Sequence, residues 1–274
     1  MRTKLLGLLL AALLVLGFAG QGMATTTFGP DSMIRTYYDS ALSGSSTETA
    51  TNMNTSLLTS ATYSAGVIGD VIGSSLLPSF STAKVSYWGY SGLNTSSDQY
   101  WVSNNGSAPK IGGGQSDGLG ANIDVANGGF SGVVPNYNGA AGAVGSVSGA
   151  PNSITIARAN GYYGGSEGTG SAQGSFFSTM TPAQASISLA ALATTGYVDT
   201  TFWYFNYNGS QSAVSGVSLA TLRTYRADAN GSENFTGGLY VATEIIPSAV
   251  PIPPSVLLLG SGLLGLIGLR RRSA

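Results

Sequence analysis

The sequence predicts an all-β ectodomain with a sandwich or jelly-roll-like fold, flanked by an N-terminal signal helix and a single C-terminal transmembrane helix. Short segments rich in β-branched and aromatic residues recur along the chain, bounded by Gly, Asn, Pro or Asp, without regular helices between them. The chain contains 14 Tyr, 9 Phe and 3 Trp, whereas disordered chains are poor in aromatics. Both ends are apolar runs next to basic residues. We therefore divide the chain into residues 1–24, 25–249 and 250–274.

The first 24 residues have the pattern of a secretory signal peptide. Arg2 and Lys4 precede the apolar run Leu5–Ala19, and Gly22 and Ala24 place small residues before a cleavage site. This order of a basic, an apolar and a small-residue region predicts cleavage after Ala24. The alternative is an N-terminal anchor that stays uncut.

Each predicted strand is short, rich in β-formers and bounded by turn residues. A further hairpin signal is Tyr162–Tyr163. In chain order, the predicted strands are Met33–Tyr38, Lys84–Tyr90, Gln99–Val102, Ser153–Ala157, Ser175–Ser178, Ala185–Leu192, Thr200–Tyr207, Val214–Tyr225 and Leu239–Ile246.

Three stretches lack a clear strand pattern. Ser43–Asn54 is polar and is predicted to be a loop, and the glycine-punctuated stretch Gly106–Gly149 is predicted to be loop-rich. One short helix is predicted within Thr55–Leu77, although three glycines there count against it. The helical prediction depends on apolar residues at three- and four-residue spacings, namely Leu57, Leu58, Ala61, Ala65, Ile68 and Ile72.

The tripeptide Ala-Asn-Gly occurs three times, each time followed within a few residues by an aromatic residue and another glycine. Asn-Gly is the preferred pair for a type I′ hairpin turn, because both central residues need a positive φ. The simplest interpretation is three similar hairpins. The copies begin at Ala126, Ala159 and Ala229.

Charge and composition exclude several classes of function. Of the 11 Lys and Arg and 12 Asp and Glu, five basic residues lie in the two apolar ends, so residues 25–249 carry six basic against twelve acidic residues. A net charge of −6 without a basic patch argues against a nucleic-acid partner. The chain has no His and no Cys, which excludes Ser-His-Asp and Cys-His nucleophiles, histidine or thiolate metal sites, and disulfides.

A carboxylate-based glycan-active enzyme remains open, because a pair of Asp or Glu residues is enough for glycoside cleavage. No spacing in the sequence places two of the candidates on one face, and solubilising surface carboxylates are the simpler interpretation. The candidates are Asp98, Asp117, Asp124, Glu167, Asp199 and Glu233.

One polar stretch is a weak calcium candidate. Asp228, Asn230 and Ser232 place oxygen side chains at alternate positions, as at the start of a calcium-binding loop. The EF-hand pattern is not met, because Glu233 stands where glycine is needed and Leu239 where glutamate is needed. A polar hairpin turn explains the stretch without a metal.

Aromatic clusters are the other candidate binding site. Tyr87–Tyr90, Tyr100–Trp101 and Phe202–Tyr207 place adjacent rings on both faces of their strands. Exposed rings can stack on sugars, which makes a carbohydrate-binding module an alternative function. The competing interpretation is that both faces are buried. The stacking candidates are Trp88, Trp101, Trp203 and Tyr204.

The C-terminal 25 residues combine three features of a membrane-sorting tail. Val250, Pro251, Pro253 and Pro254 form a stiff entry, an uncharged run from Ile252 to Leu269 follows, and Arg270, Arg271 and Arg272 close it. Eighteen helical residues span about 27 Å, close to the hydrocarbon thickness of about 30 Å. The arginines bias their end to the cytoplasm, so the upstream chain is expected outside.

This tail resembles the PEP-CTERM sorting signal, with Pro251-Ile252-Pro253 where the name-giving motif has Pro-Glu-Pro. The resemblance implies export in a Gram-negative bacterium, transient anchoring in the inner membrane, processing by an exosortase-type membrane enzyme, and release to the cell surface or extracellular matrix alongside exopolysaccharide. It implies no activity for residues 25–249. The sequence thus predicts a non-enzymatic, structural or adhesive surface protein without a cofactor.

Overall fold

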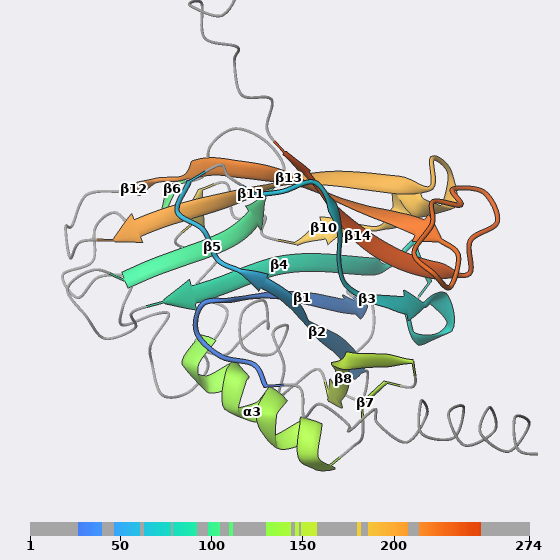
Figure 1. Ribbon diagram of the computed structural model, residues 1–274, viewed down its shortest axis with the longest axis horizontal. Helices are drawn as coiled ribbons and strands as arrows, with labels where there is room; N and C mark the ends of the chain where they lie inside the picture. The colour runs from blue at the N-terminus through green and yellow to red at the C-terminus, as the bar shows by residue number, and fades with distance from the viewer. Residues whose placement is uncertain are drawn as a thin grey trace, which may run out of the picture.

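The computed structural model shows residues 27–247, in the parts that it describes, as a large curled β-sheet with one α-helix against its outer face (Figure 1). The described residues are 27–39, 47–60, 63–77, 79–91, 98–104, 110–111, 130–143, 146–147, 149–157, 180–181, 186–207 and 214–247. The predicted signal peptide, the sorting tail and the segments Tyr162–Tyr163 and Ser175–Ser178 lie outside them. No helix within the described ranges is long and apolar enough to cross a membrane.

The main sheet has eleven strands in the order β3-β14-β13-β11-β5-β4-β1-β2-β8-β7, with β10 paired to β4. Its ladders are antiparallel throughout, which confirms the all-β prediction. The strands are β1 (Ser32–Asp39), β2 (Thr47–Ser56), β3 (Gly66–Gly73), β4 (Ala83–Ser91), β5 (Asp98–Asn104), β7 (Ser146–Val147), β8 (Ala150–Ala157), β10 (Ile187–Ser188), β11 (Tyr197–Tyr207), β13 (Val217–Ala227) and β14 (Tyr240–Pro247).

Smaller elements complete the described fold. β6 (Lys110–Ile111), β9 (Met180–Thr181) and β12 (Val214–Ser215) form a three-stranded sheet. The helices are the 3₁₀ turns η1 (Ser74–Leu76) and η5 (Ala190–Ala193) and the α-helix α3 (Phe130–Ala143). The predicted strand Ala185–Leu192 is therefore only partly a strand, because β10 ends at Ser188 and η5 follows.

The sheet curls until its first strand, β3, meets β2 and β8 near its other end. A Cβ built on Gly69 of β3 would lie 3.3 Å from the Cα of Met53 in β2, so the two backbones touch. The sheet is therefore nearly closed, with an interior face and an outer face.

Both faces of the sheet are buried over much of their area. The interior cluster includes Met33, Tyr37, Met53, Trp101 and Ile245, which come from strands spread along the sheet order from β14 to β2. The outer cluster packs under α3 and contains the following buried residues: Ile34, Tyr38, Ala50, Trp88, Tyr100, Val102, Ile154, Trp203 and Phe205. Alternate residues of one strand thus enter two separate cores.

The helix α3 was missed in the stretch Gly106–Gly149, which was predicted to be loop-rich. Val133, Val134 and Tyr137 lie on one face of α3 and are buried in the outer cluster. Figure 1 shows α3 in light green beside β7 and β8. Pro135 and the glycines weaken the helix locally, so burial of its apolar face has to stabilise it.

The helix predicted within Thr55–Leu77 is wrong, because residues 66–73 form β3. Ile68 and Ile72 both face the interior, and a four-residue spacing fits a strand as well as a helix. The predicted loop Ser43–Asn54 is also wrong in part. Its second half belongs to β2, where Thr49 and Thr51 are buried at the strand centre.

The turn at Asp228–Gly231 differs from the predicted type I′ geometry. Gly231 has a φ of +84°, whereas Asn230 is not among the residues with positive φ. The Gly231 N–H donates to the Asp228 carbonyl at 2.9 Å, and the Asp228 N–H donates to the Ser232 carbonyl at 2.9 Å. This is a type I turn followed by a left-handed glycine in a bulge. The other two Ala-Asn-Gly copies lie outside the described residues.

Candidate functional site

A layer of polar side chains crosses the interior of the curled sheet, and the guanidinium of Arg35 lies at its centre. Arg35 is fully buried. Its NH1 donates to Thr243 Oγ1 at 2.9 Å, and its NH2 donates to Thr51 Oγ1 at 3.2 Å and to the Asp70 carbonyl at 2.7 Å. One side chain on β1 thus contacts β14, β2 and β3. Among the described residues, no carboxylate lies within 4.0 Å of this cation.

Asp70 joins the two ends of the sheet. Its Oδ2 accepts hydrogen bonds from the Asn152 N–H at 2.7 Å and from Ser153 Oγ at 2.8 Å, and its Oδ1 accepts from Asn152 Nδ2 at 2.9 Å. Ser153 Oγ also lies 2.8 Å from Thr51 Oγ1. Hydrogen bonds accepted by one carboxylate therefore connect β3 to β8 in place of a backbone ladder.

Tyr87 forms the third part of the polar layer. Its hydroxyl lies 2.6 Å from Thr224 Oγ1 and 2.8 Å from Thr243 Oγ1. Burial raises the pKa of Tyr87, and the neighbouring Tyr37 adds to the rise. Burial also raises the pKa of Tyr37. The Tyr87 hydroxyl is enclosed and hydrogen-bonded to two strands, so it supports the closed sheet.

The raised tyrosine pKa values predict a loss of stability at alkaline pH. The folded state holds the phenolic protons more tightly than the unfolded chain, whose tyrosines titrate near pH 10. The free energy of unfolding should therefore fall as the pH rises above about 10, by up to about 1.4 kcal/mol per pH unit for each such tyrosine. Urea unfolding at pH values from about 8 to about 11 measures this slope. The Tyr87→Phe variant should show a shallower slope, and equal slopes would contradict the assignment.

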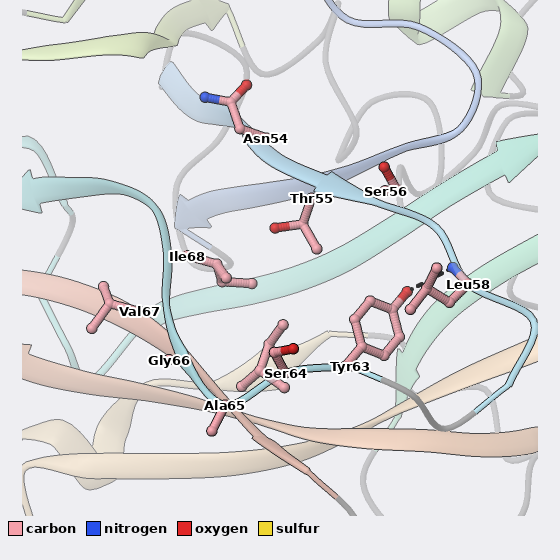
Figure 2. A pocket seen from close by; sticks show the side chains of 11 residues that line it. Asn54, Thr55, Ser56, Leu58, Tyr63, Ser64, Ala65, Gly66, Val67 and Ile68 are labelled. Atoms are coloured by element: carbon pink, nitrogen blue, oxygen red, sulfur yellow. Dashed lines mark hydrogen bonds between the residues drawn. The ribbon is translucent and has the colours of Figure 1, made fainter.

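An open pocket of about 360 Å³ lies between the end of β2 and the start of β3. Figure 2 shows Thr55 of β2, Ile68 of β3 and the ring of Tyr63 converging on this space. None of the lining side chains carries a charge at neutral pH. The lining residues are Asn54, Thr55, Ser56, Leu58, Tyr63, Ser64, Ala65, Gly66, Val67, Ile68 and Ile245.

The wall between the two strands is fixed by the backbone of Leu58. Its N–H donates to the Tyr63 hydroxyl at 3.0 Å, and its carbonyl accepts from Trp101 Nε1 at 2.6 Å. The pocket contains hydroxyl groups and apolar surface but no carboxylate, amine or imidazole. Its chemistry suits binding of an uncharged group.

The four predicted glycan-stacking residues are buried. Trp88 and Trp203 lie in the outer cluster, and Trp101 and Tyr204 lie in the interior cluster. Trp203 and Tyr204 are the more accessible pair, each 8% exposed. A stacking platform needs an exposed ring face, so the structure corrects the idea that these rings form one and places them in two cores.

The calcium candidates lie in the turn between β13 and β14. Asp228 Oδ1 accepts from Asn234 Nδ2 at 2.7 Å, and Asn230 Oδ1 accepts from the Ser232 N–H at 3.0 Å. These oxygens hold the turn together. Within the described ranges, no three Asp or Glu residues gather as a potential metal site.

Two of the six carboxylate candidates have described side chains. Asp199 forms a bidentate ion pair with Arg223, at 2.7 Å to Nε and 2.9 Å to NH2, on the outer face of β11 and β13. Glu233 is exposed beside the β13–β14 turn. The side chains of Asp98, Asp117, Asp124 and Glu167 lie outside the described set.

The comparisons with known proteins add no identification. No family model matches the chain, and neither a curated protein nor a solved structure is significantly similar to it. The sorting-signal residues Val250, Pro251, Pro253, Pro254 and Arg270–Arg272 lie outside the described residues. The assignment of function therefore depends on the residues themselves.

Sequence reasoning missed the Arg35–Asp70 cluster and the pocket. A signal for the cluster was available, because each charge stands alone in an apolar strand, as in Met33-Ile34-Arg35 and Gly69-Asp70-Val71. In a chain with only 8% charged residues, an isolated charge among β-formers indicates a buried, partnered side chain.

Proposed function

We propose that this chain is an exported, non-enzymatic protein of the cell surface or extracellular matrix, structural or adhesive in an exopolysaccharide context. The observation that carries the proposal is the three-part tail, with prolines at 251, 253 and 254, an apolar run to Leu269 and three arginines. In this proposal a signal helix directs export from a Gram-negative cell, and a short C-terminal helix anchors the folded β-domain in the inner membrane. An exosortase-type enzyme then releases it.

The structure of the domain is compatible with a structural role. Both NH groups of Arg35 and the carboxylate of Asp70 form hydrogen bonds within the sheet, and many of the described aromatic residues are buried in two cores. The absence of His and Cys from the sequence removes the commonest nucleophilic and metal-dependent mechanisms. The stability of such a domain has to come from burial and hydrogen bonding, because it cannot form disulfides.

Mass spectrometry of the protein recovered from its own cells tests the sorting step. We expect the mature chain to begin at Thr25 and to lack Arg270–Arg272. A variant with Arg270, Arg271 and Arg272 replaced by Gln keeps the length of the tail and should retain it uncut. If the unaltered protein keeps its three arginines in every recovered form, the sorting proposal is wrong and a plain single-span anchor replaces it.

A further inference from the structure

The pocket between β2 and β3 lies where the nearly closed sheet lacks a strand pairing. Among the described strands, β8 pairs with β2 only along Thr47–Thr51, so the stretch from Asn52 to Ser56 has a described ladder on its β1 side alone. β3 pairs with β14 alone among the described strands. The two strands touch at Gly69 and Met53, and the pocket occupies the space between their unpaired edges beyond this contact (Figure 2).

The lining of the pocket selects the kind of segment that can bind there. It offers a tyrosine ring, the apolar side chains of Ile68, Ile245 and Val67, and hydroxyls, with no charged side chain. Val67 is 51% exposed. Unpaired strand edges hydrogen-bond extended backbone, and aromatic-lined grooves bind proline-rich segments in the polyproline conformation. An uncharged, extended, proline-containing segment matches both properties.

The last described strand ends beside the pocket, and such a segment follows it in the sequence. Ile245 forms part of the pocket wall, and β14 ends two residues later at Pro247. The next seven residues, Ser248 to Pro254, are uncharged and include three prolines. The four residue-to-residue steps from Pro247 to Pro251 reach at most about 14 Å. A tether this short gives the segment an effective concentration at the pocket on the order of millimolar. The bound state is therefore populated even if the binding is weak.

We propose that Val250–Pro254 binds in the pocket between β2 and β3 of its own domain. Proline fixes φ and biases the preceding residue to extended backbone, which lowers the entropy lost on binding. The identity of this segment as a sorting motif rests on the proposed function. The binding itself does not depend on the proposed function. If the segment binds, the folded domain holds the motif in place and controls the access of the sorting enzyme to it.

Disulfide trapping tests the docking cleanly, because the chain has no cysteine of its own. The full chain carrying Thr55→Cys and Ile252→Cys, purified in detergent, should form an intramolecular disulfide under mild oxidation. The control pair is Ser218→Cys with Ile252→Cys. Ser218 is exposed and lies two residues from Ala220, the ladder partner of Pro247, so it is close to the tether point but away from β3. The Thr55 pair should cross-link at least about five-fold more than the control.

A third variant distinguishes binding in the pocket from random encounters between two cysteines on the same chain. Ala65 is exposed at the pocket rim, so Ala65→Arg should leave the fold intact while placing a cation against the apolar segment, and it should lower the Thr55–Ile252 yield several-fold. Equal yields from the two cysteine pairs, or a disulfide that joins two chains, would overturn the inference. The cross-linking measurement uses uncleaved protein. If the tail is never removed in cells, the sorting proposal is wrong, but the cross-linking result is unaffected.

Discussion

Arg35→Ala is expected to lower the free energy of unfolding by about 4 kcal/mol. The substitution empties the volume of a fully buried side chain, and large-to-small changes in a core cost about 2–5 kcal/mol. The substitution also leaves part of the polar layer without a hydrogen-bond donor. Thr243 and Thr51 keep Tyr87 and Ser153 as partners, whereas the Asp70 carbonyl loses the hydrogen bond from Arg35 NH2.

A second arginine on the outer face supplies the matched control. The side chain of Arg223 is 25% exposed, and its partner Asp199 is 38% exposed. Solvent screens this ion pair, so Arg223→Ala should cost about 1 kcal/mol or less. Urea unfolding followed by the fluorescence of the three buried tryptophans measures both variants. Equal losses for Arg35→Ala and Arg223→Ala would contradict the central role assigned to Arg35.

Arg35→Met separates volume from charge. Methionine refills much of the space without a cation, and replacing a buried charge by an apolar side chain of similar size is often tolerated. We therefore expect Arg35→Met to lose clearly less stability than Arg35→Ala. If the two variants are equally unstable, the hydrogen bonds of the guanidinium, and not its volume, dominate.

Local sequence patterns predicted most of the strands but could not predict how the sheet closes. The predicted strand Val214–Tyr225 contains enough β-branched and aromatic residues to be identified from its own composition, although the structure divides it into β12 and β13. The pairing of β3 with β14 joins Val67 to Glu244, and no local pattern encodes so distant a partner. Closure further depends on the side chain of Asp70, whose partners Asn152 and Ser153 lie on another strand.

The errors in the predicted elements have two physical causes. Ile68 and Ile72 are four residues apart, a spacing that helices and strands share, and the β-branched neighbours Val67 and Val71 favour the strand. In α3, tertiary burial of Val133, Val134 and Tyr137 overrides the low helix propensity of glycine and proline. Propensity decides an element only where packing does not.

The candidate site was predictable only in part. Adjacent aromatics pointing to both faces of β4 and β11 were correctly recognised, and the structure buries both faces. Whether the outer face of the sheet is covered depends on α3 and other segments distant in the sequence. A pattern of aromatic residues does not reveal where those segments pack. The pocket likewise arises from two strand edges that happen to face each other, so no motif in the sequence marks it.

Gly196→Ala is expected to be the other severely destabilising change, at about 4 kcal/mol or more. Gly196 has a φ of +79°, and an added Cβ would lie 2.4 Å from the Cβ of Phe235 and 2.5 Å from its carbonyl oxygen. The surrounding contacts leave little freedom to move, since the Arg226 N–H donates to the Gly196 carbonyl at 2.8 Å and the rings of Tyr197 and Phe235 are 5.5 Å apart.

Gly149→Ala isolates the steric part of this effect. Gly149 has nearly the same φ, +78°, but an added Cβ there would meet nothing within 4 Å. The left-handed backbone alone costs a non-glycine residue about 1–2 kcal/mol, and both variants incur this cost. The difference in their unfolding free energies therefore measures how firmly the segment around Phe235 is packed against the start of β11. Equal losses would mean that this segment moves aside freely, and the close contact at Phe235 would then contribute nothing to the stability of the sheet.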